Sequence, residues 1–259
     1  MIDELRHALP QHQLAVYYQP IVDLSTGETV KAEAPLRWHH SQTDLMLPGE
    51  FIGLAEQTCL IGDIGDWVVG EAIMRAREWS TLLGTPFQIS VNKSPVEFMS
   101  KAPVKYWGTH LAALESAWAN IAIEITEGVL LNDSPSVREK LEYLQKMGVQ
   151  LVLDDFGTCY SSMTYLKKFK VDYLKIDQSF VRDVTTSGDS RAIAETIILM
   201  ALKLGLKVIA QGVETVEQRD WLKAAECDYA QGFLFSEPVP SQDFEILLKK
   251  GRAQHLALA

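Results

Sequence analysis

The chain alternates short apolar stretches with longer amphipathic ones. Runs rich in apolar and β-branched residues, bounded by polar or glycine positions, are typical of strands. Eight such runs occur, at residues 14–21 (LAVYYQPI), 30–38 (VKAEAPLRW), 87–92 (FQISVN), 121–126 (IAIEIT), 149–155 (VQLVLDD), 171–177 (VDYLKID), 206–212 (LKVIAQG) and, most weakly, 228–232 (DYAQG). Helical periodicity lies between them, at residues 48–57, 66–82, 134–148, 191–205 and 215–226.

Eight strands separated by helices predict an α/β protein with a parallel (β/α)8 TIM-like barrel. A doubly wound open sheet is the alternative, but it usually carries a glycine-rich fingerprint after its first strand. The glycines of IGDIGDWVVG lie between helical stretches at the wrong spacing for that fingerprint. With no repeat or Pro/Gly linker, we expect a single domain over residues 1–259, with its core at about 10–250.

Composition narrows the function classes. The formal net charge of −10 argues against a broad surface for duplex nucleic acid, whereas a small anion bound through a metal ion remains compatible with it. No apolar run approaches the ~20 residues of a membrane span, and the polar start MIDELRHALPQHQ is no signal peptide. Three scattered cysteines without a CxxC pair favour a reducing compartment, and we expect a cytoplasmic domain.

Polar residues recur within or at the C-terminal ends of the predicted strands. They are Glu33, Asn92, Glu124, Asp154, Asp155, Lys175, Gln211 and Gln231. In a barrel these ends converge on one mouth, where active sites form. Carboxylate and amide oxygens suit Mg²⁺ or Mn²⁺, and an aspartate pair that bridges two cations suits two-metal phosphoryl chemistry.

Each residue also has a purely structural reading. Glu33 would then be a strand residue facing solvent, and Asn92 would cap the helix that starts at SPVEF. Asp154 and Asp155 would end a strand and begin a turn. Turns alone do not account for acids and amides at most of the strand ends, and we therefore expect a shared site.

Eight segments together carry a family resemblance. In chain order they are YYQPIVDLSTGETVKAEAPLRW, PGEFIGLAEQTCLI, ISVNKSP, IEITE, LVLDDFGTCYSS, VDYLKID, VIAQGVET and CDYAQGFLFSEPVP. Their order and spacing resemble the EAL domain family, bacterial phosphodiesterases that open the second messenger cyclic di-GMP. The resemblance covers nearly the whole chain, and it implies a barrel with its site at the strand C-termini.

The resemblance also implies a role for individual residues. The residues that resemble metal ligands are Glu33, Asn92, Glu124, Asp154 and Asp155. Lys175 resembles the lysine that holds the attacking water, and Glu127 the acid that steadies the loop from Phe156 to Ser162. Contacts to the ligand phosphate and its neighbouring groups are implied for Arg37 and Gln19, and contacts at the guanine and the site floor for Glu214 and Gln231.

Three positions depart from the family pattern. Pro35 replaces the leucine of the Glu-Ala-Leu triplet, and Cys159 replaces the second glycine of DFGTGYSS. Gln211 stands where the family has a glutamate beside the metal pair, proposed as a ligand or base. A glutamine carbonyl still ligates a cation, but it does not take a proton. We therefore expect weakened metal binding and a slowed reaction.

Two functional readings follow. The first is a metal-dependent phosphodiesterase that opens cyclic di-GMP to pGpG, favoured by the retained acids and Lys175. The second is a catalytically impaired cyclic di-GMP receptor that signals through a protein partner, favoured by the three departures. A domain that binds no ligand would need the loss of Arg37 or Gln231, which are present. Homodimers and linked sensor or diguanylate cyclase domains are compatible with either reading.

Overall fold

A computed structural model describes residues 1–100, 118–132, 134–158, 166 and 168–258, with side chains described up to residue 251. Eight of the described strands close a barrel in the order β1-β2-β5-β6-β7-β8-β9-β10, with β10 returning to β1. Their bounds are Leu14–Asp23 (β1), Thr29–Glu33 (β2), Gln88–Asn92 (β5), Ile121–Thr126 (β6), Gln150–Phe156 (β7), Tyr173–Ile176 (β8), Lys207–Ala210 (β9) and Tyr229–Ala230 (β10). The TIM-like barrel expected from the sequence is confirmed.

The expectation that all strands run parallel is wrong for β1. It pairs antiparallel with both of its barrel neighbours, β2 and β10, while the other barrel pairs are parallel. The reason is the short link to β2, because a parallel crossover needs a dozen residues or more. Here the chain reverses between Asp23 and Thr29: the Asp23 carboxylate accepts from Ser25 N (2.8 Å) and Thr26 N (3.1 Å), and Gly27 takes φ +78°.

The strand expected at residues 30–38 is two strands. It breaks at Ala34-Pro35 into β2 and β3 (Leu36–His40), and β3 leaves the barrel to pair with the first half of β1. Ala34 N donates to Ser90 O (2.9 Å), and Pro35 O accepts from Tyr17 N (3.0 Å). Pro35 thus lies between two ladders, where its missing N–H costs no strand pairing.

Two short strands that the sequence pattern did not predict complete the sheet. They are β4 (Asp44–Met46), paired with β3, and β11 (Val239–Pro240), paired with β1.

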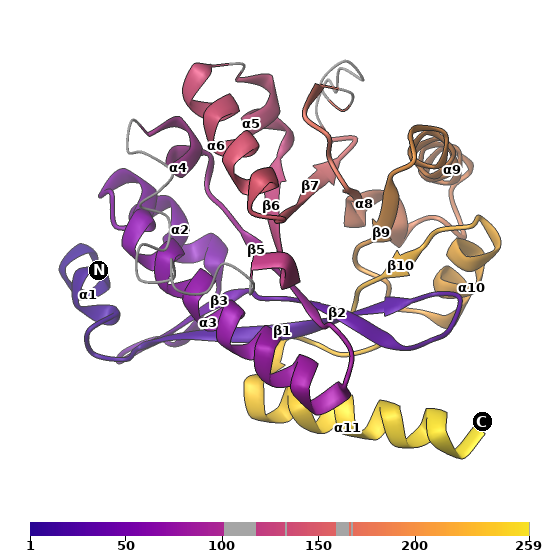
Figure 1. The fold of residues 1–259 in the computed structure, drawn as a ribbon, viewed down its shortest axis with the longest axis horizontal. Coiled ribbons are helices and arrows are strands. Elements are labelled where there is room, and N and C mark those ends of the chain that lie inside the picture. The colour runs from indigo at the N-terminus through magenta and orange to yellow at the C-terminus, as the bar shows by residue number, and fades with distance from the viewer. Residues whose placement is uncertain (101–117, 133, 159–165, 167, 259) are drawn as a thin grey trace.

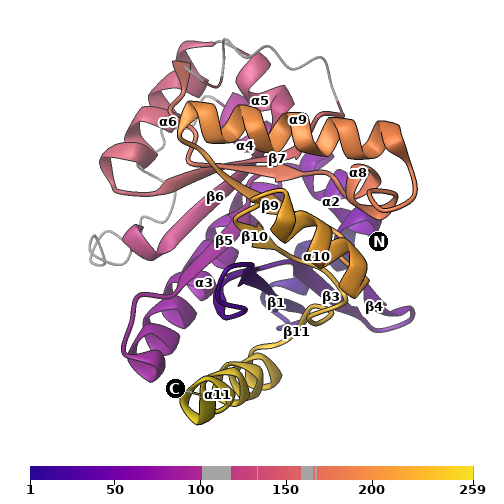
Figure 2. The ribbon, with the colours of Figure 1, turned by 90° about the vertical axis from the view of Figure 1, so that its right-hand side faces the viewer.

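The helices surround the barrel. Five lie close to the predicted helical segments: α2 (Pro48–Gln57), α3 (Ile61–Leu83), α6 (Pro135–Lys146), α9 (Gly188–Leu204) and α10 (Val216–Ala224). The remaining described ones are α1 (Ile2–Ala8), α4 (Pro95–Met99), α5 (Glu127–Leu131), α8 (Gln178–Arg182) and α11 (Ser241–Leu258). Figure 1 shows α11 on the opposite side of the barrel from α5 and α6, and Figure 2 shows α9 and α10 on its outer side. Across the described part of the chain, no helix has the length and apolar character needed to cross a membrane.

Alternation along the strands divides the barrel interior from its outer shell. On β6, β7 and β8 one set of side chains joins the large core under the helices, and this set includes Ile123, Leu151 and Leu174. The other set faces inward, where a small apolar layer is formed by Ile21, Ala122, Val152, Tyr173 and Ile209. The inward set becomes polar at both ends of the barrel, and the C-terminal end holds the candidate site.

Candidate functional site

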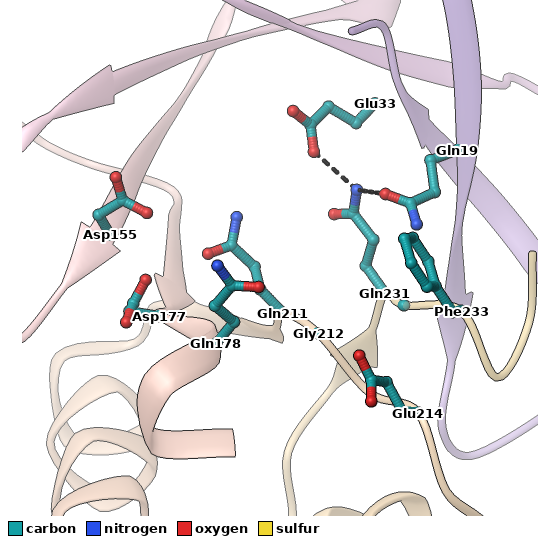
Figure 3. Close-up of a pocket in the computed structure, with 11 residues that line it drawn as sticks. Gln19, Glu33, Asp155, Asp177, Gln178, Gln211, Gly212, Glu214, Gln231 and Phe233 are labelled. Carbon is teal, nitrogen blue, oxygen red and sulfur yellow. Dashed lines mark hydrogen bonds between the residues drawn. The ribbon is translucent and has the colours of Figure 1, made fainter. Parts of the chain in front are cut away.

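A cavity of about 270 Å³ opens at the C-terminal end of the barrel. It is lined by Gln19, Glu33, Asp155, Asp177, Gln178, Gln211, Gly212, Glu214, Gln231, Gly232 and Phe233. Figure 3 shows these side chains on several strands and loops that converge on one space. Four of them are acids, so the cavity has a negative wall.

Lys175 lies at the centre of the polar groups below the cavity. Its fully buried Nζ lies 2.7 Å from Glu124 Oε2, 3.0 Å from Glu33 Oε2 and 3.7 Å from Asp154 Oδ1. Burial disfavours the charged ammonium, but the charges of Asp154, Glu124 and Glu33 outweigh this and hold the pKa of Lys175 well above its usual range. The lysine is therefore a fixed positive charge among three carboxylates.

The acids respond differently to burial. Burial opposes ionisation of Glu33, yet the charge of Lys175 and hydrogen bonds from Gln231, Lys175 and Asn92 lower its pKa. For Glu124, burial and then the charge of Glu33 raise the pKa to about 8. In the cavity wall, loss of solvent and then the charge of Asp154 raise the pKa of Asp155 to about 6. One ammonium thus leaves negative charge at this end of the barrel uncompensated.

Four side-chain amides brace these acids. Asn92 Nδ2 donates to Glu33 Oε1 (2.8 Å), and Gln231 Nε2 donates to Glu33 Oε2 (2.6 Å) and Gln19 Oε1 (2.8 Å). Gln19 Nε2 in turn donates to Ser236 O (3.1 Å), and Gln211 Nε2 donates to Asp154 Oδ1 (2.9 Å). The last bond depends on an amide, because an ionised glutamate has no proton to donate.

A β-bulge explains how two adjacent aspartates serve one site. The register between β7 and β8 shifts between Leu153 and Phe156, and Asp155 takes φ +52°. Neighbouring residues of a regular strand point to opposite faces, whereas a bulge redirects one of them. Asp154 therefore reaches Lys175, while Asp155 lines the cavity. Figure 3 shows Asp155 beside Asp177.

The other residues expected at the site lie further out. Glu214 lines the cavity and is exposed. Arg37 is buried on β3 and does not line the cavity; its guanidinium lies 5.5 Å from the Tyr17 ring centre. Buried Glu127 accepts from Gly157 N (2.9 Å), at the start of the loop assigned to it. Cys159 lies outside the described residues.

Sequence reasoning missed five residues that line the cavity: Asp177, Gln178, Gly212, Gly232 and Phe233. Asp177 directly follows β8 and caps α8 through Ser179 N (2.9 Å). The rule that selected Lys175, a polar residue at a strand end, applies equally to Asp177. Phe233 is 60% exposed and carried no polar signal, so the pattern did not reveal it.

The donor set fits a hard cation by its chemistry. Glu124 Oε1 is buried and has no hydrogen-bond partner in the described structure, and oxygen ligands of this kind suit Mg²⁺ or Mn²⁺. The side chains are held by Lys175 and the amides, and the described residues include no group of three or more His, Cys, Asp or Glu arranged to hold a metal.

Comparisons with known proteins agree on one family. The EAL domain model matches residues 2–238. The bifunctional diguanylate cyclase/cyclic di-GMP phosphodiesterase MucR of Pseudomonas aeruginosa is 37% identical over 242 residues, 93% of this chain and 35% of its own. The cyclic di-GMP phosphodiesterase NbdA of the same organism is 38% identical over 252 residues, 97% of this chain and 32% of its own. The chain thus spans about a third of the length of these curated relatives.

Solved structures give the same result. A MucR phosphodiesterase complex with c-di-GMP superposes with a TM-score of 0.87 at 38% identity, covering 94% of this chain and 98% of that one. The EAL domain of Mycobacterium smegmatis DcpA gives a TM-score of 0.76 at 33% identity, covering 92% and 98%.

Proposed function

Because the chain belongs to the EAL domain family, we propose that it is a metal-dependent phosphodiesterase that opens cyclic di-GMP to linear pGpG. One observation carries the proposal: three carboxylates and Lys175 meet beneath a cavity at the C-terminal end of the barrel. Relatives whose names describe cyclic di-GMP phosphodiesterases support the choice of substrate.

The charge of the substrate has the same sign as the charge of the cavity wall. Cyclic di-GMP carries two negatively charged phosphodiesters, and four acids line the cavity that would receive it. Two Mg²⁺ or Mn²⁺ ions, when bound, would neutralise this charge and lower the pKa of a water. The residues proposed to hold them are Glu33, Asn92, Glu124, Asp154 and Asp155.

Each remaining residue has a separate task. Lys175 contacts and orients Glu33, Glu124 and Asp154, and it would hold the attacking water. Arg37 has no ion pair in the described chain and would fork onto a phosphate oxygen. Gln19, Gln231 and Glu214 would contact the nucleotide, while Glu127 holds the loop at Gly157.

Gln211 favours a second candidate, a cyclic di-GMP receptor with impaired catalysis. Its amide donates to Asp154 Oδ1, which stabilises this carboxylate without a metal and supplies no base. Loss of a general base typically costs about 10²–10⁴-fold in rate. We favour the enzyme because the other proposed ligands and Lys175 share one site.

The domain would act within a larger assembly. MucR pairs a phosphodiesterase with a diguanylate cyclase, as its name states, and this chain spans about a third of that relative. We infer that sensor or cyclase domains are linked to this one in the bacterial cytoplasm, and that homodimers are a candidate arrangement.

Incubation with cyclic di-GMP and Mg²⁺ or Mn²⁺ tests the function. Chromatography should show the linear dinucleotide with wild type, and none with EDTA or with the Asp154→Asn variant. Ligand binding without any product, in both metals, would favour the receptor. No binding under any condition would reject both candidates.

A further inference from the structure

A second buried charge cluster lies next to Asn92, outside the cavity. Lys93 Nζ lies 2.6 Å from Glu97 Oε1 and 3.6 Å from Asp66 Oδ1, and the side chains of Lys93 and Glu97 are 1% and 4% exposed. Asn92 ends β5 and donates to Glu33, whereas the next side chain, Lys93, contacts α4 and α3. The backbone at this point therefore connects the site to the ion pair.

Glu97 contacts both residues that follow Asn92, one with each carboxylate oxygen. Oε1 accepts from Lys93 Nζ, and Oε2 accepts from Ser94 N (3.0 Å) in the capping box of α4. Lys93 N also donates to Glu124 O (3.0 Å), and Ser94 Oγ donates to Glu56 Oε1 (2.6 Å). The two residues after Asn92 are thus fixed through both backbone and side chains.

Gly65 on α3 provides the space for the ion pair. A Cβ added at Gly65 would lie 2.5 Å from Glu97 Oε1 and 2.8 Å from Lys93 Nζ. Both atoms are the far ends of flexible side chains, so an added methyl would move the pair before it moved the helix. Gly70, on the same helix, has open space at the corresponding position.

A buried lysine fixes the other end of α4. Lys140, 2% exposed on α6, donates from Nζ to Glu97 O (2.7 Å), Phe98 O (2.9 Å) and Ser100 O (2.6 Å). Cations stabilise the carbonyl end of a helix. The five-residue helix α4 is therefore held at both ends by buried charge.

We propose that the Lys93–Glu97 pair, seated against Gly65, positions the Asn92 amide for its contact with Glu33 and for the metal site. This inference rests on the proposed function for its catalytic consequence only. A buried ion pair is often no more stabilising than an apolar pair of similar volume, so stability alone does not account for it. Outer-sphere groups that orient ligands typically change metal affinity by about 10–100-fold.

The test displaces the pair without changing a charged residue. Gly65→Ala is compared with Gly70→Ala as the matched control. The first readout is the NMR signal of the Asn92 side-chain amide in metal-free protein, assigned with Asn92→Ala. We expect Gly65→Ala to shift or broaden this signal and Gly70→Ala to leave it unchanged. A Lys93→Met/Glu97→Gln variant, which removes both charges together, should give the same displaced signal with the fold retained.

The second readout is Mn²⁺ affinity by calorimetry. Gly65→Ala should weaken it about tenfold, and should cause no further loss in the Asn92→Ala background. An unchanged Asn92 signal in Gly65→Ala and in the Lys93→Met/Glu97→Gln variant would overturn the inference. So would a Gly65→Ala substitution that weakens Mn²⁺ binding equally in the wild-type and Asn92→Ala backgrounds. A wild type that binds no Mn²⁺ would contradict the proposed function, while the amide signal would still decide the inference.

Discussion

Two lysines enter the same barrel at opposite ends and meet opposite environments. Lys175 on β8 contacts Glu33, Glu124 and Asp154, and its pKa is held well above the usual range because these charges outweigh burial. Lys31 on β2 has no ion pair in the described chain, and burial lowers its pKa to about 8, only partly opposed by Asp172. The pKa of a buried lysine thus differs strongly between the two ends of the barrel interior.

The N-terminal end is closed by a ring of hydrogen bonds between Lys31 and uncharged side chains. Lys31 Nζ donates to Gln88 Oε1 (2.6 Å) and Tyr173 Oη (2.5 Å), and both Gln88 and Tyr173 donate to Gln150 Oε1 (2.6 and 3.1 Å). The ring joins β2, β5, β7 and β8 without a carboxylate. One end therefore holds a single lysine among uncharged side chains, and the other concentrates several charges where a ligand enters.

The largest effect is expected for Lys175→Met. Removing one partner of a buried charge network typically costs about 3–5 kcal/mol, because the remaining carboxylates lose their compensation. Urea denaturation in EDTA should show a loss of this order, and turnover should disappear. Saturating Mn²⁺ should restore part of the stability, because it supplies the missing positive charge. If the variant is as stable as wild type in EDTA, the expected difference in stabilisation between Lys175 and Lys31 is contradicted.

Gln211→Glu should increase the difference in charge between the two ends of the barrel. It replaces the donor to Asp154 by a further negative charge, so metal-free stability should fall while kcat rises by at most about 10²–10⁴-fold. Product chromatography and denaturation with and without Mn²⁺ measure the two effects. An inert wild type rescued by this change would identify the natural chain as a receptor. If both proteins are inert with saturating metal, Gln211 is not the limiting defect, and Pro35 and Cys159 become the next candidates.

Arg37→Ala tests a positive charge near the Lys175 end that has no carboxylate partner in the described structure. A charge-assisted hydrogen bond to phosphate contributes on the order of 1.5–3 kcal/mol, so affinity for cyclic di-GMP should fall roughly tenfold or more. Calorimetry in Ca²⁺, which should suppress turnover, measures it. Equal affinity in wild type and variant would contradict the proposed phosphate contact.

Lys31→Met should have the smallest effect. Loss of two hydrogen bonds opposes the gain from removing a buried cation, and we expect a change in unfolding free energy within about 1 kcal/mol. Turnover should not change, because the ring lies at the other end of the barrel. A loss of stability as large as that of Lys175→Met, measured in the same urea series, would remove the distinction between the two ends.

The sequence predicted those parts of the fold that depend on local pattern. Buried strands such as IAIEIT appear as apolar runs, and their polar ends marked the site. The direction of β1 depends on the length of its link to β2, and the break at Pro35 depends on which strands β2 and β3 pair with. The strand direction and the break both depend on tertiary structure, which an apolar run in the sequence does not reveal.

Several polar residues in and below the cavity were predictable one by one from the strand ends, but their network of contacts was not. Glu33, Glu124 and Asp154 meet at Lys175 because side chains alternate along β2, β6, β7 and β8. That Gln211 donates to Asp154, or that Lys31, Gln88, Gln150 and Tyr173 form a ring, depends on registers between strands far apart in the chain. Which side chain donates a hydrogen bond to which can be determined only from the folded structure.

The direction of β1, the one strand of the eight-stranded barrel that pairs antiparallel with both neighbours, has a consequence for how the chain folds. Along one edge, β1 pairs Val22 with Ala230 and Tyr17 with Pro240, so the partners on this edge lie more than 200 residues later in the sequence. Contacts of such long separation form slowly, since a large loop must close before they stabilise anything. During synthesis, β1 leaves the ribosome before β10 and β11 and keeps one edge unpaired until residues near 240 follow. Barrel closure, and with it the placement of Gln19 beside Gln231, is therefore a late event in the life of each new chain.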